Sequence, residues 1–226
     1  SVVTSITSTP PEYYPPASTI PEFAKISLND LIFLAGNRQL TLVPVSGVIS
    51  GLPGATLSLV VSDSLLVGVP KIMIVRIGSD LHQFVYNSGD KSYYSDFSFP
   101  VSGQIQAYLE VDYGSGQFDS VGFKLQSLPW GVTFDDSDNI LPGTEVFLYT
   151  KNGSRVPMET YGQANPFITD ANGGFGWIVP NGEYYIVAQK TGYYKNTSAS
   201  FRISANIYNS RINLIKQPLP ILSVIN

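Results

Sequence analysis

The sequence predicts an all-β protein built of two tandem β-sandwich domains. Three observations support this prediction: apolar and polar residues alternate in many short segments, turn residues separate these segments, and one set of landmarks occurs twice. Hydrophobic residues make up 43% and aromatic residues 12% of the 226 residues. The chain can therefore bury the cores of two such domains.

Two stretches in the N-terminal part each allow two interpretations of their secondary structure. Residues 1–19 contain two Pro-Pro pairs, which favour a semi-rigid extended linker, although "SVVTSIT" also alternates like an edge strand. Residues 21–35, "PEFAKISLNDLIFLA", could hold a short helix. Their β-branched and aromatic content suits a strand equally well.

The segments that follow alternate with a period of two residues, as half-buried strands do. Gly, Pro, Asn or Asp lies between most of them. Many short strands at regular spacing are typical of sandwiches and barrels. The predicted strands are residues 39–49, 56–63, 71–78, 82–87, 97–101, 104–111, 121–125, 130–134, 145–150, 175–179, 184–190, 198–204 and 212–216.

A coarse internal repeat divides the chain. Leu-Pro-Gly precedes a strand in residues 51–60 and again in residues 140–149. Residues 97–111 and 175–189 share alternating aromatics, a Pro, a Gly and a long alternating strand. We therefore expect a linker or strand at 1–19, sandwiches at 20–127 and 128–217, and at 218–226 a tail or the start of another module.

Composition excludes several classes of function. The net charge is −4, only 13% of residues are charged, and no Lys or Arg block exists, so a nucleic-acid partner is not expected. The absence of cysteine excludes disulfides and thiolate metal sites. No apolar run reaches the roughly 18 residues of a membrane helix, so no membrane insertion is expected within this chain.

Four stretches in the second half together carry a family resemblance. They are "VTFDDSDNILPGTEVFLYTKNG", read as a first hairpin, "YGQANPFITD", "TDANGGFGWIVPNGEYYIVAQKTGYY" and "ASFRI", read as the last edge strand. Residues 131–217 thereby resemble the carboxypeptidase regulatory-like domains. The resemblance implies a transthyretin-like (prealbumin-like) seven-stranded sandwich, related to the B-type repeats of bacterial surface adhesins. Residues 20–126 resemble immunoglobulin-like domains only in general.

Residues 169–194 contain the most organised part of this resemblance. Phe175 and Trp177 are spaced to share one face of a strand, which we expect to be the core face, and Asn181-Gly182 predicts a hairpin connection. The adhesin repeats often hold an internal isopeptide bond that needs a Lys, an Asn or Asp, and a carboxylic acid. Gln189 stands at the position expected for that acid, so we expect no such bond.

Asp135, Asp136 and Asp138, in the run "DDSDN", are weak calcium candidates. Oxygen ligands at alternating positions resemble a calcium loop, but the Gly and distal Glu of an EF-hand are missing. Asp and Asn also suit a hairpin turn, because their side chains bind nearby backbone N–H groups. The turn is the preferred interpretation, and no other cofactor is expected.

Tyrosine is abundant, with 14 residues, several of them in adjacent pairs. Alternation places one member of each pair in the core and the other outward. Outward aromatics on a rigid sandwich can stack on sugars or anchor a protein partner. The candidates, all near predicted turns, are Tyr93, Tyr94, Trp130, Tyr161, Tyr193 and Tyr194.

These features favour a non-catalytic segment of an extracellular or cell-surface protein, structural or adhesive. There is no Gly-x-Ser-x-Gly elbow, no phosphate-cradling loop and no evident carboxylate pair, so we expect no enzyme activity. The expected partner is a protein or a glycan, and strand exchange through residues 1–19 could make a homo-oligomer. The alternatives are a carbohydrate-binding accessory module and accessory domains of a larger secreted enzyme.

Overall fold

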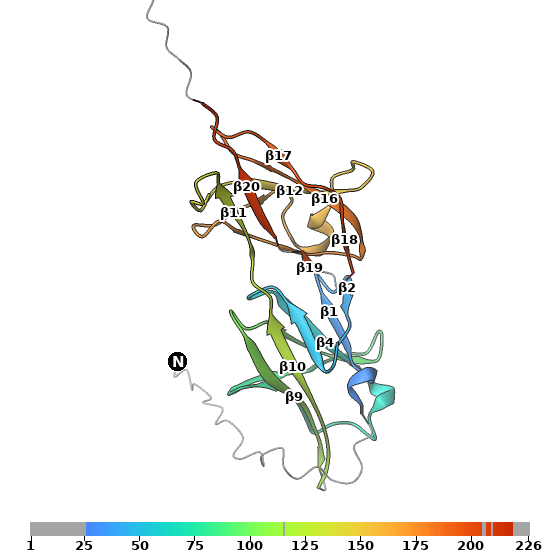
Figure 1. Cartoon of the computed structure of the whole chain (residues 1–226). Helices are drawn as coiled ribbons and strands as arrows, with labels where there is room; N and C mark the ends of the chain where they lie inside the picture. The colour runs from blue at the N-terminus through green and yellow to red at the C-terminus, as the bar shows by residue number, and fades with distance from the viewer. Residues whose placement is uncertain (1–25, 115, 205–206, 209, 219–226) are drawn as a thin grey trace, which may run out of the picture.

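The computed structural model describes residues 26–114, 116–204, 207–208 and 210–218. Two β-sandwiches lie end to end in an elongated molecule, and the chain passes from the long strand β10 straight into β11 (Figure 1). The predicted fold class, all-β with two tandem sandwiches, is confirmed. No helix among these described residues is long and apolar enough to cross a membrane.

The first sandwich pairs two five-stranded sheets. One has the order β2 (Leu40–Leu42), β1 (Ile32–Ala35), β4 (Thr56–Ser62), β8 (Ser92–Ser98), β7 (Val85–Asn87). The other has the order β3 (Val48–Gly51), β10 (Gln117–Ser127), β9 (Gln104–Gly114), β5 (Ile72–Ile77), β6 (Asp80–Gln83).

This strand order is that of an immunoglobulin sandwich. Strands β1, β4, β8 and β7 correspond to the ABED sheet, and β5, β9 and β10 to the CFG sheet. Strand β3 crosses from the first sheet to the second, where it pairs in parallel with β10. The general immunoglobulin-like resemblance of this half therefore fits the observed topology.

Period-2 alternation produces the core of this domain. Leu57, Leu59 and Val61 of β4 point inward and are fully buried. Phe33 and Phe123 come from opposite sheets and meet edge to face with ring centroids 5.2 Å apart. The sheets are thus held together by the side chains whose alternation predicts the strands.

Residues 21–35 suited a helix or a strand equally well, and the described part of this stretch contains both a helical turn and a strand. Residues Leu28–Asp30 form the 3-10 turn η1, and β1 begins two residues later. The Asp30 carboxylate caps this turn by accepting a hydrogen bond of 2.9 Å from the Ser27 backbone N–H. A second 3-10 turn, η2, spans Asp63–Leu65. Residues 1–25 lie outside the described residues, so the linker-or-strand alternative stays a prediction.

The second sandwich has a three-stranded sheet facing a larger one. The smaller has the order β14 (Gly174–Phe175), β11 (Gly131–Asp135), β20 (Arg211–Leu214). The larger has the order β13 (Phe167–Ile168), β12 (Glu145–Thr150), β16 (Gly182–Gln189), β17 (Asn196–Thr197), with β18 (Phe201–Ile203) also on β16. Strand β15 (Trp177–Ile178) pairs with β19 (Ile207–Tyr208), and η3 spans Met158–Tyr161.

The predicted hairpin at Asn181-Gly182 is wrong. Strand β15 pairs with β19, whereas β16 pairs with β12, so this turn carries the chain from one sheet to another. Turn residues signal a reversal of direction. They do not specify whether the reversal stays within one sheet or crosses the sandwich.

The predicted first hairpin of the second sandwich is also shorter than expected. The strand predicted to be the last one is followed by a further strand. Strand β11 turns back at residues 135–140 through a single bridge between Phe134 and Ile140, and β12 then joins the opposite sheet. Strand β18 is an edge strand as predicted, but β20 follows it and pairs in parallel with β11.

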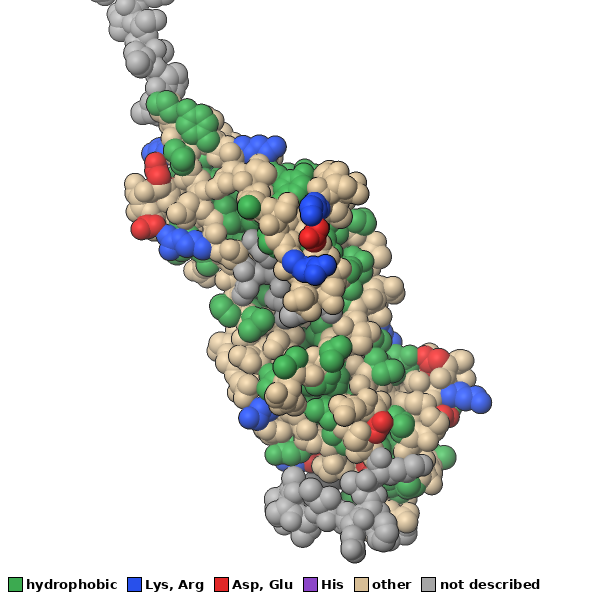
Figure 2. Space-filling view, turned by 45° about the vertical axis from the view of Figure 1, so that its right-hand side comes forward, with side chains coloured by type: hydrophobic (Ala, Val, Ile, Leu, Met, Phe, Trp, Pro, Cys, Tyr) green, Lys and Arg blue, Asp and Glu red, His purple; other side chains and the backbone are tan. Residues whose placement is uncertain are grey.

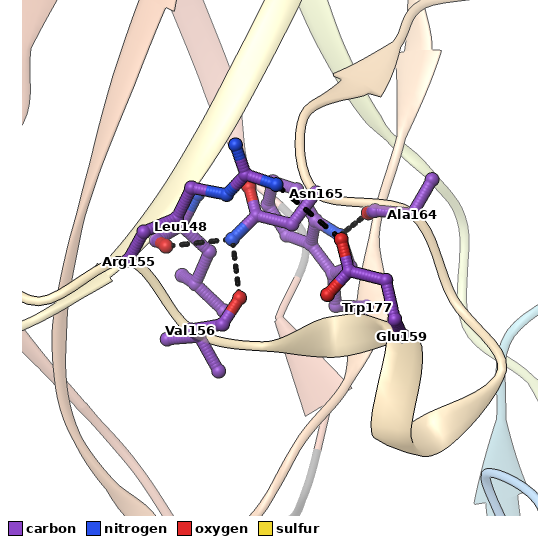
Figure 3. A network of polar contacts seen from close by, with 7 residues as sticks. All are labelled: Leu148, Arg155, Val156, Glu159, Ala164, Asn165 and Trp177. Atoms are coloured by element: carbon purple, nitrogen blue, oxygen red, sulfur yellow. Dashed lines mark hydrogen bonds and ion pairs between the residues drawn. The ribbon is translucent and has the colours of Figure 1, made fainter.

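Phe175 and Trp177 are both fully buried, as their spacing predicts. Their rings meet edge to face at 5.9 Å. The indole N–H of Trp177 donates to the Ala164 carbonyl at 2.8 Å. Next to it the Asn165 side chain bonds to the backbone of Leu148 and Val156 (Figure 3). This polar network ties the loop before β13 to the core.

Candidate binding cleft

The two sandwiches meet in a packed joint around Trp130 and Gly176. A Cβ atom added at Gly176 would lie 3.0 Å from Cε3 of Trp130 and 3.2 Å from Cδ2 of Leu52. Leu52 belongs to the first sandwich and is 2% exposed. Glycine is therefore the residue that lets the second sandwich approach the first this closely.

The second sandwich also contributes directly to the core of the first. Ile178 is 3% exposed and belongs to the hydrophobic cluster of the first domain. The Gln163 amide holds the Ile178 backbone, accepting from its N–H at 2.9 Å and donating to its carbonyl at 2.6 Å. Full burial of such a side chain is worth about 1.5–3 kcal/mol, so separation of the domains would expose a substantial apolar contact.

A second contact lies at the β1–β2 turn. A Cβ at Gly162 would lie 2.5 Å from Oδ1 of Asn37, and one at Gly36 would lie 3.1 Å from Cβ of Tyr161. Both glycines have φ near +60° (Gly36 +56°, Gly162 +65°), a conformation that glycine adopts without strain. The joint thus joins two separate segments of each sandwich and is more than a tether.

A cleft of about 750 Å³ opens beside this joint. Residues of both sandwiches form its walls, with an apolar and aromatic base and a polar rim. The lining residues are Leu34, Ala35, Gly36, Asn37, Arg38, Leu52, Pro53, Gly54, Ala55, Thr56, Ser58, Asp96, Trp130, Tyr161, Gly162, Gln163, Ala164, Phe167, Gly176 and Ile178.

Arg38 and Asp96 form the charged part of the rim. The Arg38 guanidinium donates to both carboxylate oxygens of Asp96, at 2.8 and 3.0 Å, and its Nε donates to Ser58 Oγ at 3.0 Å. The Ser58 hydroxyl also donates to Asp96. The guanidinium carbon lies 4.6 Å from the ring centroid of Tyr94. These contacts hold Arg38 in one orientation, with side chains of Arg38 and Asp96 about half exposed.

The backbone at this rim is unusual. Gly36, Asn37 and Arg38 follow one another in the left-handed region, with φ of +56°, +55° and +62°. Asn tolerates this region, whereas for Arg it is strained by roughly 1–2 kcal/mol. Strained residues of this kind concentrate where a side chain must be presented in a particular direction.

The aromatic base is a chain of rings that runs from Trp130 at the joint into the second sandwich. Trp130 lies 5.7 Å from Phe167, and Phe167 lies 6.1 Å from the buried Trp177 in an edge-to-face contact. Trp130 and Phe167 are only partly buried. Trp130 packs against the core of the first sandwich and Phe167 against that of the second, so the two cores together fix these rings in the cleft.

The structure brings together two of the six predicted aromatic candidates. Trp130 and Tyr161 both line the cleft. Tyr94 lies beside it under Arg38, and its hydrogen bond to the Asp90 carboxylate raises the pKa of its hydroxyl group. Tyr93 packs partly against the first core.

Tyr193 and Tyr194 lie elsewhere, beside the end of β20. Tyr193 forms a bridge with Lys216 and packs partly on the second core, and Tyr194 is 51% exposed. The alternation expected for tyrosine pairs holds at 184–185, where Tyr184 is buried and Tyr185 stacks on Tyr149 on the outer face at 5.2 Å. The six candidates therefore occupy separate regions and form no single strip.

Sequence reasoning missed the polar rim. Arg38, Asp96 and Gln163 come from a turn, a strand and a loop, and 58 residues separate the first two. No periodicity or motif connects such positions. The only local signal was "AGNR", because Gly-Asn is typical of a turn with positive φ.

The calcium candidates form a turn. The Asp135 carboxylate accepts hydrogen bonds from the backbone of Ser137 and Asn139 and from the Asn139 amide, at 2.8–2.9 Å. These bonds hold the pKa of Asp135 below its usual value, and the bond from the Asn139 side chain has the largest effect. Asp138 pairs with Arg211, and Asp136 is exposed. In the part of the chain that the structure describes, no three acidic or histidine side chains gather as a metal site would require.

Gln189 lies on the outer face of the second sandwich. Its amide donates to the Glu145 carboxylate of the neighbouring strand at 2.6 Å. The position at which the adhesin repeats would hold a carboxylic acid is thus occupied by one member of a cross-strand polar pair at the rim of the sheet.

Comparison with known proteins gives only distant structural likenesses. No family model and no curated protein matches the chain. BcpA, the major pilin subunit of Bacillus cereus, is similar with a TM-score of 0.28 and 16% identity, over 75% of this chain and 66% of that one. The chain thus spans slightly under two thirds of that pilin subunit.

Two other solved structures are similar at the same level. The N-terminal Ig1-2 module of the Drosophila receptor protein tyrosine phosphatase DLAR has a TM-score of 0.26 and 11% identity, over 76% of this chain and 94% of that one. The glucan utilization protein SGBP-B of Bacteroides ovatus has a TM-score of 0.26 and 13% identity, over 77% and 44%. Such scores argue neither for a family nor for a function of this chain.

Proposed function

We propose that the chain is a non-catalytic structural and adhesive segment of an extracellular or cell-surface protein. The observation that supports this proposal is the joint in which Gly176, Trp130 and Ile178 lock two sandwiches end to end. A packed joint keeps a ligand site at a fixed distance and angle from the rest of a parent protein. The molecular face in Figure 2 fits this role, because most of its surface is backbone and uncharged side chains, and the charged side chains are scattered.

The proposal also includes a domain boundary, a class for the second sandwich and a kind of partner. We place the domain boundary between residues 127 and 128, supported by two hydrophobic clusters: apart from Ile178, the buried members of the first end at Leu125, and those of the second begin at Leu141. Residues 128–217 would form the carboxypeptidase regulatory-like, prealbumin-like sandwich. The partner would be a protein or a glycan, with no nucleic acid, because no basic block exists in the sequence.

The joint predicts a rigid two-domain rod, which spin labels can test because the chain contains no cysteine. With Ser88→Cys and Lys195→Cys, both at exposed positions, double electron–electron resonance is expected to give one narrow distance distribution. Gly176→Val should broaden or shift it, since the added atoms would displace Trp130, and should cost about 1–3 kcal/mol of stability.

Gly68→Val is the matched control for this experiment. A Cβ at Gly68 meets no atom within 4 Å, and its φ is not positive. This variant should keep the native distance distribution. A broad distribution in the unmodified chain would mean that the domains move independently, and it would overturn the proposed rod.

Self-assembly through strand exchange is a further part of this proposal. Among the described residues, β7 has a paired strand on one side only, and it exposes Val85 (71%) and Tyr86 (44%). Such an edge can accept a strand from another copy. The donor would be residues 1–19, which lie outside the described residues. Deletion of residues 1–19 is expected to reduce the mass measured by light scattering to that of a monomer. Unchanged assembly would contradict strand exchange.

A further inference from the structure

We propose that the cleft between the sandwiches binds a neutral oligosaccharide, an inference that rests on the proposed adhesive function and names its ligand class and site. The cleft volume of about 750 Å³ lies within the roughly 300–1,000 Å³ of ligand sites, which occur preferentially at domain interfaces. Such a space suits an oligomeric ligand.

The charge of the cleft selects a neutral ligand. Among the described residues that line it, Arg38 and Asp96 are the only charged ones, and they neutralise each other at 2.8 Å. An anionic ligand would need an unpaired cation, and a cationic ligand an unpaired carboxylate. The paired groups still offer N–H donors and carboxylate acceptors at the rim, because both side chains are about half exposed.

The distribution of polar and apolar groups matches a sugar. A pyranose ring has apolar C–H faces and a rim of hydroxyl groups, each both donor and acceptor. The aromatic rings of Trp130, Tyr161 and Phe167 provide apolar contact area. The planar groups of Arg38 and Asp96 provide paired hydrogen-bonding atoms, and charge-assisted bonds of this kind are the stronger ones.

Arg38 is also preorganised for this task. Its guanidinium is fixed by Asp96, Ser58 and the Tyr94 ring before any ligand arrives. Little rotamer freedom of this long side chain would then be lost when a sugar binds, and this lowers the entropic cost of binding. The strained φ of +62° at Arg38 has a reason in this arrangement.

An extended peptide fits the cleft less well. Peptides commonly bind by adding a strand to an open sheet edge. Strand β1, which contributes Leu34 and Ala35 to the cleft wall, is paired with β2 on one side and β4 on the other. Its backbone groups are therefore used, and recognition on this wall has to come from side chains.

Tryptophan fluorescence provides a direct binding test. The chain has two tryptophans, and Trp177 is fully buried, so quenching by acrylamide reports mainly on the partly exposed Trp130. The probes are soluble neutral hexasaccharides of glucose, mannose, galactose and N-acetylglucosamine, with hexa-uronic acids as the anionic comparison. At least one neutral hexasaccharide is expected to protect Trp130 and to give a titration by calorimetry.

Variants locate the site. Thr56→Trp should fill the cleft and abolish binding, since Thr56 is exposed at the cleft wall. Thr197→Trp makes the same change at an exposed position on β17 and should leave binding unchanged. Asp96→Asn keeps the shape of the side chain but removes charge-assisted bonds, and it should weaken binding about tenfold.

The outcomes separate this inference from the proposed rod. Failure of all neutral hexasaccharides to bind, binding of the hexa-uronic acids alone, or full binding by Thr56→Trp would overturn the cleft as a neutral sugar site. The distance distribution between spin labels would be unaffected by any of these results. Conversely, specific binding with a broad distance distribution would overturn the rod and leave the sugar site standing.

Discussion

Replacing Asn165 by alanine is expected to lower the free energy of unfolding of the second sandwich by about 3–4 kcal/mol. Asn165 is 2% exposed. Its Oδ1 accepts from the Leu148 N–H at 3.0 Å, and its Nδ2 donates to the carbonyls of Leu148 at 2.8 Å and Val156 at 2.9 Å. Alanine would leave these backbone groups buried with fewer partners (Figure 3). Thermal and urea unfolding followed by circular dichroism measure the loss.

The matched control is Asn181→Ala. Asn181 is exposed in a turn, so its replacement should change stability by less than about 0.5 kcal/mol. Asn165→Asp tests the reason for the effect, because a carboxylate can accept from the Leu148 N–H but cannot donate to the two carbonyls. It should be at least as harmful as alanine at neutral pH. Near-native stability of Asn165→Asp would show that the donor bonds contribute little.

Asn165 also illustrates what the sequence could not predict. The alternation in residues 145–150 predicts a strand whose successive side chains lie on opposite faces, and Leu148 is buried while Phe147 and Tyr149 are only partly buried, since period 2 is a local property of the chain. The amide that satisfies the Leu148 backbone lies 17 residues away in an irregular loop. No local pattern encodes a partner of this kind, because loop positions are set by the tertiary fold.

The same distinction applies to the cleft. Trp130 could be selected from the sequence because it is an aromatic residue near a predicted turn, and it lines the cleft. Its neighbours Arg38 and Asp96 could not, since their contact depends on the pairing of β4 with β8 and on three left-handed residues in succession. Sheet crossing at Asn181 was missed for a related reason: turn chemistry is local, whereas the choice of sheet depends on packing.

Trp177→Ala is the second substitution with a large expected effect on stability, and the separate cores of the two sandwiches should confine most of this effect to the second. This variant is expected to destabilise the second sandwich by about 4–5 kcal/mol, because it removes a fully buried indole and leaves the Ala164 carbonyl without the N–H that binds it at 2.8 Å. The first sandwich has its own hydrophobic cluster, to which the second contributes Ile178. It should therefore stay folded when the second sandwich melts, less stable by the roughly 1.5–3 kcal/mol that burial of Ile178 contributes.

Calorimetry of Trp177→Ala is expected to show two transitions, and hydrogen exchange measured by mass spectrometry should find β4, β9 and β10 still protected between them. Trp177→Phe is the control: it keeps a ring against Phe175 and Phe167 but loses the N–H donor, so it should cost only about 1–2 kcal/mol. A single transition in which both sandwiches unfold together would contradict independent cores. It would show instead that the joint of Trp130, Gly176 and Ile178 couples the two domains strongly enough to make them one cooperative unit.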